Sequence, residues 1–211
     1  FGRFDKGGVY RLSRPLLGAN ALLSSPDGDV WHRQRRKASA GFRTDLLVQA
    51  TANTLACCNR LAQRWEKTRE PNGDMVVNLA SDMLKLTLDI IALTAFSYDL
   101  KSASAETSEE SPLYGAFATI IETIIGRWRG KALTSWMPTK ENRTFDACCG
   151  MLDAKVDAIV SERKQRAGRT SVDAPGDLLD HLLANGSGGD TMPAEHVRNN
   201  IKGFLFAGHD T

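Results

Sequence analysis

The sequence predicts a mainly α-helical protein with a single domain, and three observations carry this prediction. Apolar residues recur every three or four positions along most of the chain, which is the spacing of one face of an α-helix. No segment alternates convincingly between apolar and polar residues, as a half-buried strand would. The chain has 211 residues, of which 42% are hydrophobic, enough for one domain with a sizeable core.

The first helix is predicted from about Val30 to Ala40. Residues 1–25 are rich in Gly, Arg and Leu without a sustained period, and we expect a loop with short helical turns there. A turn-forming cluster then leads into the helix. Asp27 or Asp29 is expected to cap it, because an Asp side chain accepts hydrogen bonds from the first helical N–H groups.

Two long helices are expected next, separated by the Pro-Asn-Gly break at 71–73. The second helix follows the cap candidate Thr44. Its expected inward stripe consists of Leu47, Thr54, Cys58, Leu61 and Trp65. The third helix has apolar residues spaced alternately by four and three, at Leu79, Met83, Leu86, Ile90 and Leu93. This is the strongest amphipathic pattern in the chain.

The second half of the chain is predicted to hold four more helices. A polar run at 102–111 is interpreted as a linker, and an irregular aromatic segment is expected around Trp128, Trp136 and Pro138. The helices are expected at 113–125, 145–166 and 177–183, with a last one after Thr191, which is its cap candidate with Pro193 in the first turn. The buried stripe of the last helix is expected at Val197, Ile201, Phe204 and Leu205.

Charge and hydropathy exclude some classes of function. Lys and Arg number 27 against 25 Asp and Glu, and this balance argues against a dedicated nucleic-acid binder. No apolar run approaches the roughly 18 residues of a membrane-spanning helix, and no signal peptide opens the chain. Both ends are nevertheless expected to be cut, since the chain starts without Met and ends in an apolar stretch. A membrane anchor outside this chain is compatible with the sequence.

The four cysteines form two adjacent pairs, Cys57-Cys58 and Cys148-Cys149. Neighbouring residues on a helix point about 100° apart and do not converge on one metal ion. We expect small core or flank residues, and no metal ligand is assigned.

Helical geometry divides the segment around Trp31 into two faces. Trp31, Arg35 and Ala38 share one face, while three bases, Arg33, Arg36 and Lys37, fall on the other. An Arg beside an indole N–H can bind a buried carboxylate, because both donate hydrogen bonds in fixed directions. The alternative is a cation–π contact that packs the helix on its neighbour, with a solvated basic face.

The last five residues, Ala207 to Thr211, are unusual for a helix interior. Gly208 costs roughly 1 kcal/mol relative to Ala in a helix, so its presence needs a reason. A missing side chain leaves room for a flat ligand or a bound small molecule, and Asp210 and Thr211 can relay protons. A helix C-terminus with Gly as the cap is the alternative.

Taken together, these residues resemble the cytochrome P450 family. The resembling segments are the WxxxR helix at 27–36 followed by Gly41 and Phe42, the helix at 87–96, and the AGxDT motif at 207–211. Their order and separation match the family, and the resemblance covers nearly the whole chain. It implies the helical portion of the cytochrome P450 fold, truncated at both ends, in a single incomplete domain over residues 1–211.

The resemblance also implies a haem-dependent monooxygenase, which inserts one atom of dioxygen into an apolar organic substrate. Trp31 and Arg35 would hold a propionate of haem b (iron protoporphyrin IX). An electron-donor reductase or ferredoxin would dock near the outward bases Arg33, Arg36 and Lys37, whose charge steers association.

The same resemblance assigns catalytic roles near the end of the chain. Asp210 and Thr211 would guide protons to dioxygen, and Ala207 and Gly208 would leave the groove in which oxygen sits. The apolar helix at 113–125 either lines the substrate entrance or belongs to the core, and both readings stay open.

The family's ExxR helix and its cysteine-containing haem loop are expected after Thr211, so this fragment alone is predicted to be inactive. The alternative function is a non-catalytic truncated relative or a helical interaction module, in which Trp31 and Arg35 only pack. With an N-terminal anchor in the full-length protein, the resemblance implies the cytosolic face of the endoplasmic reticulum membrane.

Overall fold

The computed structural model describes residues 8–26, 28–104, 111–130, 135–167, 176–184 and 191–209, and within these ranges it contains helices and no strand. The helices are α1 (Gly8–Leu12), α2 (Arg14–Leu17), α3 (Asp29–Gly41), α4 (Thr44–Lys67), α5 (Leu79–Phe96), the 3₁₀ turn η1 (Ser102–Ser104), α6 (Pro112–Trp128), α7 (Lys140–Ala167), α8 (Leu178–Leu183) and α9 (Ala194–His209). The prediction of a mainly α fold is confirmed.

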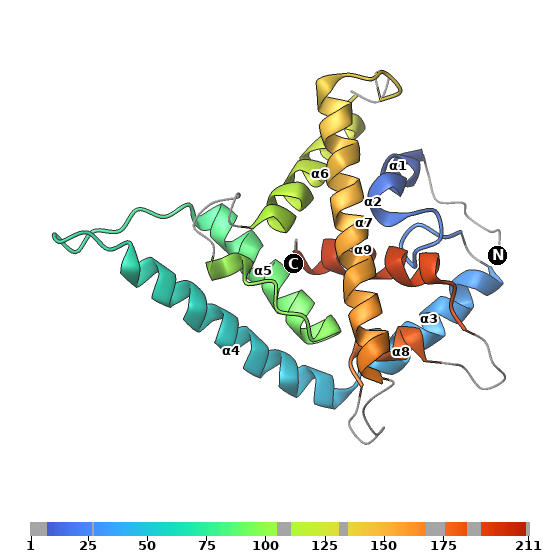
Figure 1. Ribbon diagram of the computed structural model, residues 1–211, viewed down its shortest axis with the longest axis horizontal. Helices are drawn as coiled ribbons and strands as arrows, with labels where there is room; N and C mark the ends of the chain where they lie inside the picture. Colours follow the sequence, from blue (N-terminus) through green and yellow to red (C-terminus); the bar gives the residue numbers. More distant parts are fainter. Residues whose placement is uncertain are drawn as a thin grey trace.

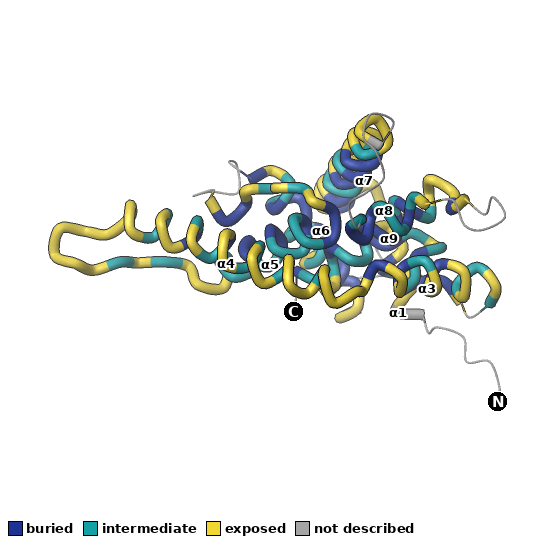
Figure 2. Tube along the Cα trace, turned by 90° about the horizontal axis from the view of Figure 1, so that it is seen from below, coloured by how far each residue is buried: buried dark blue, intermediate teal, exposed yellow. Residues whose placement is uncertain are grey.

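Helix α9 runs through the middle of the molecule and crosses α7, with α5 beyond its C-terminal end (Figure 1). Helix α5 packs between α4 and α9, α6 packs on α7, and α3 packs on α8. Buried residues gather where α5 to α9 meet, whereas the outer side of α4 is exposed (Figure 2). Among the described helices, none combines the length and apolar character needed to span a bilayer.

The main core is built by apolar side chains from α2, α3, α5, α6, α7, α8 and α9. Its most deeply buried large members are Leu16, Leu17, Leu88, Phe96, Phe117, Ile120, Phe145, Leu152, Leu178, Leu179, Leu182 and Ile201. A second, smaller cluster between α4 and α5 contains Cys57, Leu61, Leu86 and Ala103. Three of the four residues of the stripe expected in α9 are buried, with Phe204 half-buried. The helix at 113–125 lies within α6 and places Phe117 and Ile120 in the main core.

Helix α5 is buried on two faces, which a one-sided amphipathic pattern did not predict. Its expected stripe, represented by Leu86, packs toward α4, while Leu88 and Phe96 on another face belong to the main core. Leu79, the first residue of the expected stripe, is exposed. Leu47 at the start of the α4 stripe is also 66% exposed, because α5 covers only the later turns of α4.

Two expected helix caps, Asp29 and Thr44, were wrong. Asp29 is the first residue of α3, Gly28 occupies the cap position without a side-chain bond, and Asp27 lies outside the described residues. Thr44 is likewise the first helical residue of α4, after Arg43. Helix α9 begins at Ala194, and the carbonyl group of Pro193 accepts from the N–H group of Val197 at 3.1 Å, so the helix starts right after the expected Pro193.

Other boundaries also differ from the prediction. Helix α7 begins earlier than the expected Phe145, and Trp128 ends α6 instead of opening an irregular segment. The start of the polar run at 102–111 is buried: the N–H groups of Ser102 and Ala103 donate to the carboxylate of Asp89 at 2.8 and 2.9 Å. Burial raises the pKa of Asp89 despite these two bonds.

The cysteine thiols pack among apolar side chains, as expected. Cys57 is fully buried between α4 and α5, and Cys148 and Cys149 pack against the main core. Burial raises the pKa of Cys149 to about 12, which keeps this thiol protonated near neutral pH.

Two glycines set close contacts that position the functional region. A Cβ atom on Gly41, at the end of α3, would lie 2.9 Å from Leu178 Cδ1 and 3.2 Å from Leu178 Cα. Gly18, just after α2, has a φ of +72°, and a Cβ atom there would lie 2.1 Å from the side chain of Asn199. Glycine therefore lets α3 approach α8, and lets the segment after α2 approach α9.

Candidate functional site

Trp31, Arg35 and Ala38 were expected on one inward face of α3. Trp31 and Arg35 do lie side by side, but only Ala38 is buried; Trp31 is half-buried and Arg35 is exposed, so the inward direction was wrong for Arg35. The guanidinium carbon of Arg35 lies 5.7 Å from the centroid of the Trp31 ring. The indole N–H of Trp31 donates to the backbone carbonyl of Leu22 at 3.1 Å. This donor is therefore engaged within the protein, and Arg35 supplies the cationic donors of this face.

A network of neutral amides joins α3, α9 and the loop at 18–26. Asn200 accepts a hydrogen bond from the N–H group of Leu22 at 2.8 Å and donates to the side-chain oxygen of Gln34 at 2.9 Å. Gln34 in turn donates to the carbonyl group of Asn20 at 2.8 Å. Both side chains are almost completely buried. Amide bonds are directional, so this network fixes the loop relative to both helices.

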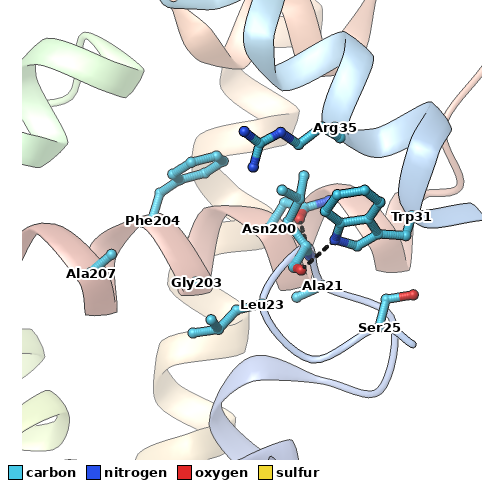
Figure 3. Close-up of a pocket in the computed structure, with 10 residues that line it drawn as sticks. Ala21, Leu23, Ser25, Trp31, Arg35, Asn200, Gly203, Phe204 and Ala207 are labelled. Carbon is cyan, nitrogen blue, oxygen red and sulfur yellow. Dashed lines mark hydrogen bonds between the residues drawn. The ribbon is translucent and has the colours of Figure 1, made fainter. Parts of the chain in front are cut away.

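These elements enclose a pocket of about 400 Å³, drawn in Figure 3. Its lining residues are Ala21, Leu22, Leu23, Ser25, Trp31, Arg35, Asn200, Gly203, Phe204 and Ala207. Most of the wall is apolar, and the exposed Arg35 contributes its one charged side chain. The pocket suits a largely apolar ligand that carries an anionic group at its edge.

The pocket brings together three of the six residues that the sequence singled out. Trp31 and Arg35 come from α3, and Ala207 comes from the last turn of α9, far away in the sequence. Gly208 follows Ala207, but a Cβ atom there would lie 2.6 Å from Ile91, so the missing side chain lets α9 pack closely on α5. Asp210 and Thr211 lie outside the described residues.

Neighbouring contacts hold the last turn of α9. Thr87 donates from its hydroxyl to the carbonyl oxygen of His209 at 2.8 Å. The buried ring of His209 meets Phe117 edge-on, with the ring centroids 5.0 Å apart. Helices α5 and α6 therefore fix the backbone on which Ala207 and Gly208 lie.

The basic face of α3 points away from this pocket. Arg33 and Arg36 are exposed, and Lys37 is half-buried and donates to the backbone carbonyl of Ala184 at 3.1 Å. Arg33 and Lys37 also border a smaller cavity of about 200 Å³, together with His196. Arg33 and Arg36 are thus exposed, as expected, whereas the expectation fails for Lys37, which is half-buried against the end of α8.

Sequence reasoning missed the residues that hold the pocket in shape. Asn200 and Gln34 are polar residues within apolar patterns, and this was the one available signal for them. The loop residues Leu22 and Leu23 carry no motif. Their place in the pocket depends on contacts with a helix almost the whole chain away.

The described helices and this pocket define a class: a helical protein with a mostly apolar pocket next to an arginine. The family model described as "Cytochrome P450" matches residues 1–211. The chain therefore belongs to the cytochrome P450 family, as its motifs indicated.

Individual relatives are distant but cover nearly all of the chain. It is 24% identical over 220 residues to "Cytochrome P450 4F3" of Mus musculus, which covers 96% of this chain and 40% of that protein. It is 25% identical over 213 residues to "Bifunctional cytochrome P450/NADPH--P450 reductase 2" of Bacillus subtilis (strain 168), covering 99% of this chain and 19% of that protein. The structure of the "cytochrome P450DA heme domain" superimposes with a TM-score of 0.77 at 25% identity, over 99% of this chain and 43% of that one. The chain thus spans less than half the length of these proteins.

Proposed function

We propose that this chain forms one side of the haem pocket in a monooxygenase, which inserts one oxygen atom into an apolar organic substrate. The observation that carries the proposal is the shared pocket of Trp31, Arg35 and Ala207, which come from opposite ends of the chain. The family of the chain supports haem as the cofactor.

The residues of the pocket fit haem b. A porphyrin is flat and apolar with carboxylates at one edge, and the pocket offers Leu22, Leu23 and Phe204 as apolar wall and Arg35 as cation. Among the described residues, Arg35 contacts the Trp31 ring and has no carboxylate partner, so its donors can bind a propionate. Trp31 supports Arg35 with its ring face, while its N–H group holds Leu22.

Haem iron with a thiolate ligand activates dioxygen, so that one oxygen atom enters the substrate and the other leaves as water. We propose that Ala207 and Gly208 leave room for dioxygen beside the helix backbone. Asp210 and Thr211 are proposed to hold and pass on the protons that this reaction consumes. Neither residue contributes to the described structure, so their role rests on the family motif.

The electron donor is proposed to be an acidic protein that docks on the basic face of α3, at Arg33, Arg36 and Lys37. The relative from Bacillus subtilis is joined to a reductase in one chain, which supports a reductase as the donor class. Several close bases on an exposed helix face raise the rate of association with an acidic surface. With an N-terminal anchor in the full-length protein, we propose the cytosolic face of the endoplasmic reticulum membrane as its location.

The proposed function is tested with the protein expressed from its complete coding sequence. The reduced protein is treated with carbon monoxide, and we expect the Soret shift that is typical of a thiolate-ligated haem. A spectrum without this shift would contradict the monooxygenase proposal and favour a non-catalytic helical interaction module.

Substitution of Arg35 separates the propionate role from simple packing. Arg35→Ala is expected to lower haem occupancy after gel filtration several-fold, measured as haem absorbance per polypeptide. Arg33→Ala is the matched control, since it removes a cation from the outward face of the same helix and should leave occupancy unchanged. Equal occupancy in both variants would exclude Arg35 as a propionate ligand.

A second substitution tests the proton relay. Thr211→Ala is expected to release peroxide at the expense of product, because protons reach dioxygen less efficiently. The measurement compares oxygen consumed with product and peroxide formed. Unchanged coupling would remove Thr211 from the relay.

A further inference from the structure

Both backbone polar groups of one residue in the pocket wall, Leu22, are bound by side chains from two different helices. The N–H group of Leu22 donates to Asn200 Oδ1 on α9 at 2.8 Å, and the carbonyl group of Leu22 accepts from Trp31 Nε1 on α3 at 3.1 Å. In Figure 3 the side chains of Trp31 and Asn200 reach the loop from two sides. We call this arrangement of Leu22, Trp31 and Asn200 the Leu22 clamp.

The side chain of Asn200 has one orientation that satisfies its surroundings. Its Nδ2 donates to Gln34 Oε1 and to the carbonyl of His196, both at 2.9 Å, which leaves Oδ1 as the acceptor for Leu22. Asn200 is 1% exposed, so no water competes for these bonds. The amide is therefore oriented before any ligand arrives.

The clamp determines where the apolar wall of the pocket lies. Leu22 and Leu23 line the pocket and are adjacent to the clamped peptide, and neither belongs to a helix that would hold it. Upstream, Gly18 and Asn199 hold the start of the same loop against α9. When the bond to Asn200 is lost, the N–H group of Leu22 loses its contact with α9, and only the bond from Trp31 to the Leu22 carbonyl still ties this residue to α3.

We propose that Asn200 is a positioning residue for the leucine wall of this pocket. It holds the Leu22 peptide, and thereby sets the distance between the leucine wall and α9 that an alkyl or aromatic part of a ligand must fit. Asn200 carries no charge and performs no chemical step. This inference rests on the proposed haem-dependent function for its ligand, but the clamp itself can be tested without it.

The first experiment measures hydrogen exchange at the Leu22 amide in the full-length protein. Asn200→Ala removes the acceptor of this amide, and its exchange is expected to rise at least about tenfold. Arg198→Gln is the matched control: it breaks a bond between α9 and Asp157 of α7, away from the loop, and should leave Leu22 unchanged. Exchange at Leu22 within about twofold of the wild type in Asn200→Ala would overturn the clamp.

A second amide in the same variant separates positioning from a general loss of structure. Leu205 lies on the buried face of α9, so its amide should exchange as slowly in Asn200→Ala as in the wild type. An equal rise in exchange at Leu22 and Leu205 would contradict the clamp and indicate that the whole region has loosened.

The second experiment uses two haem ligands that differ only in an apolar tail, imidazole and 1-octylimidazole, and follows the Soret band. Asn200→Ala is expected to reduce the preference for the octyl compound by about fivefold, since the tail meets a displaced leucine wall. The preference should be unchanged in Arg198→Gln. An unchanged preference in Asn200→Ala would overturn the positioning role. A protein without haem would instead contradict the proposed function, while the exchange experiment would still decide the clamp.

Discussion

The two ends of α3 are held by different chemistry. Beside the pocket, neutral groups connect the helix to its surroundings: the indole of Trp31 and the amides of Gln34 and Asn200. At the other end, Gly41 packs on α8, and α8 is fastened by charges. There Arg163 binds both carboxylate oxygens of Asp177, at 2.8 and 2.7 Å.

The charged network extends beyond this one pair. Arg163 also donates to Asp180 at 2.7 Å and to the carbonyl group of Phe96 at 2.8 Å, and therefore joins α7, α8 and α5. Asp177 in turn caps α8. Burial would lower the pKa of Arg163, but the hydrogen bonds that its guanidinium donates to the two aspartates outweigh burial and raise the pKa above its ordinary value. Charges thus join helices away from the pocket, whereas neutral amides shape the wall next to a proposed cofactor without adding charge.

The largest expected effect is the loss of Arg163. Arg163→Met leaves the carboxylate of Asp177, whose side chain is 5% exposed, buried without its partner, and should lower the free energy of unfolding by about 3–5 kcal/mol. Denaturant unfolding measures this change. Arg166→Met is the control on the same helix, since its exposed pair with Glu162 should contribute less than about 1 kcal/mol. A similar decrease in the free energy of unfolding in both variants would mean that the buried network does not stabilise the packing of α8.

The next effect concerns the loop at the neutral end. Gly18→Ala should destabilise the protein by about 3 kcal/mol, because its backbone is in a region reserved for glycine and the new methyl group meets Asn199. Gly73→Ala is the control, because Gly73 also has a positive φ, of 89°, but has open space around it. This substitution should lower the free energy of unfolding by only about 1 kcal/mol. The difference between the two melting temperatures isolates the contact with α9.

A smaller loss is expected at the centre of the neutral network. Gln34→Met removes the donor to Asn20 and the acceptor of Asn200, and should lower the free energy of unfolding by about 1–3 kcal/mol. Asn53→Ala breaks a part-buried hydrogen bond to Thr94 at 3.3 Å and should lower the free energy of unfolding by less than Gln34→Met does. If Gln34→Met lowered the free energy of unfolding as much as Arg163→Met, the charged network would not contribute more stability than the neutral one.

The last prediction concerns how stability changes with pH at the buried pair of Asp82 and Arg64, between α5 and α4. Burial would raise the pKa of Asp82, but hydrogen bonds from Arg64 and Trp65 outweigh it, so the folded-state pKa is lowered. The pair therefore adds stability above the ordinary pKa of Asp, and this contribution disappears as the pH falls through the lowered value. The stability difference between wild type and Asp82→Asn should shrink in that acidic range. A difference that stays constant down to the lowest pH would contradict the assignment.

Much of the fold could be predicted because helical periodicity is a local property of the sequence. The face shared by Trp31 and Arg35 follows from the rotation of about 100° per residue and is present in the structure. Caps were less predictable. Asp29 and Thr44 are good cap residues, yet each lies one position inside its helix, where packing decides the boundary.

The candidate site could be predicted only in part, for a physical reason. Trp31, Arg35 and Ala207 belong to motifs, whereas Asn200 and Gln34 act through bonds to a loop whose path depends on the whole fold. The motif also gave one explanation of Gly208, space for a ligand. The close approach of Ile91 adds a second one that periodicity cannot reveal.

The contact at Gly41 has a mechanical consequence for α3. A Cβ atom at Gly41 would lie 3.2 Å from Leu178 Cα, so the end of α3 and the start of α8 are in close contact. Near the other end of the helix, Trp31 is bonded to the carbonyl group of Leu22 in the pocket wall. Helix α3 is therefore a strut about 15 Å long between these two contacts, and it links the position of α8 to that of the pocket wall.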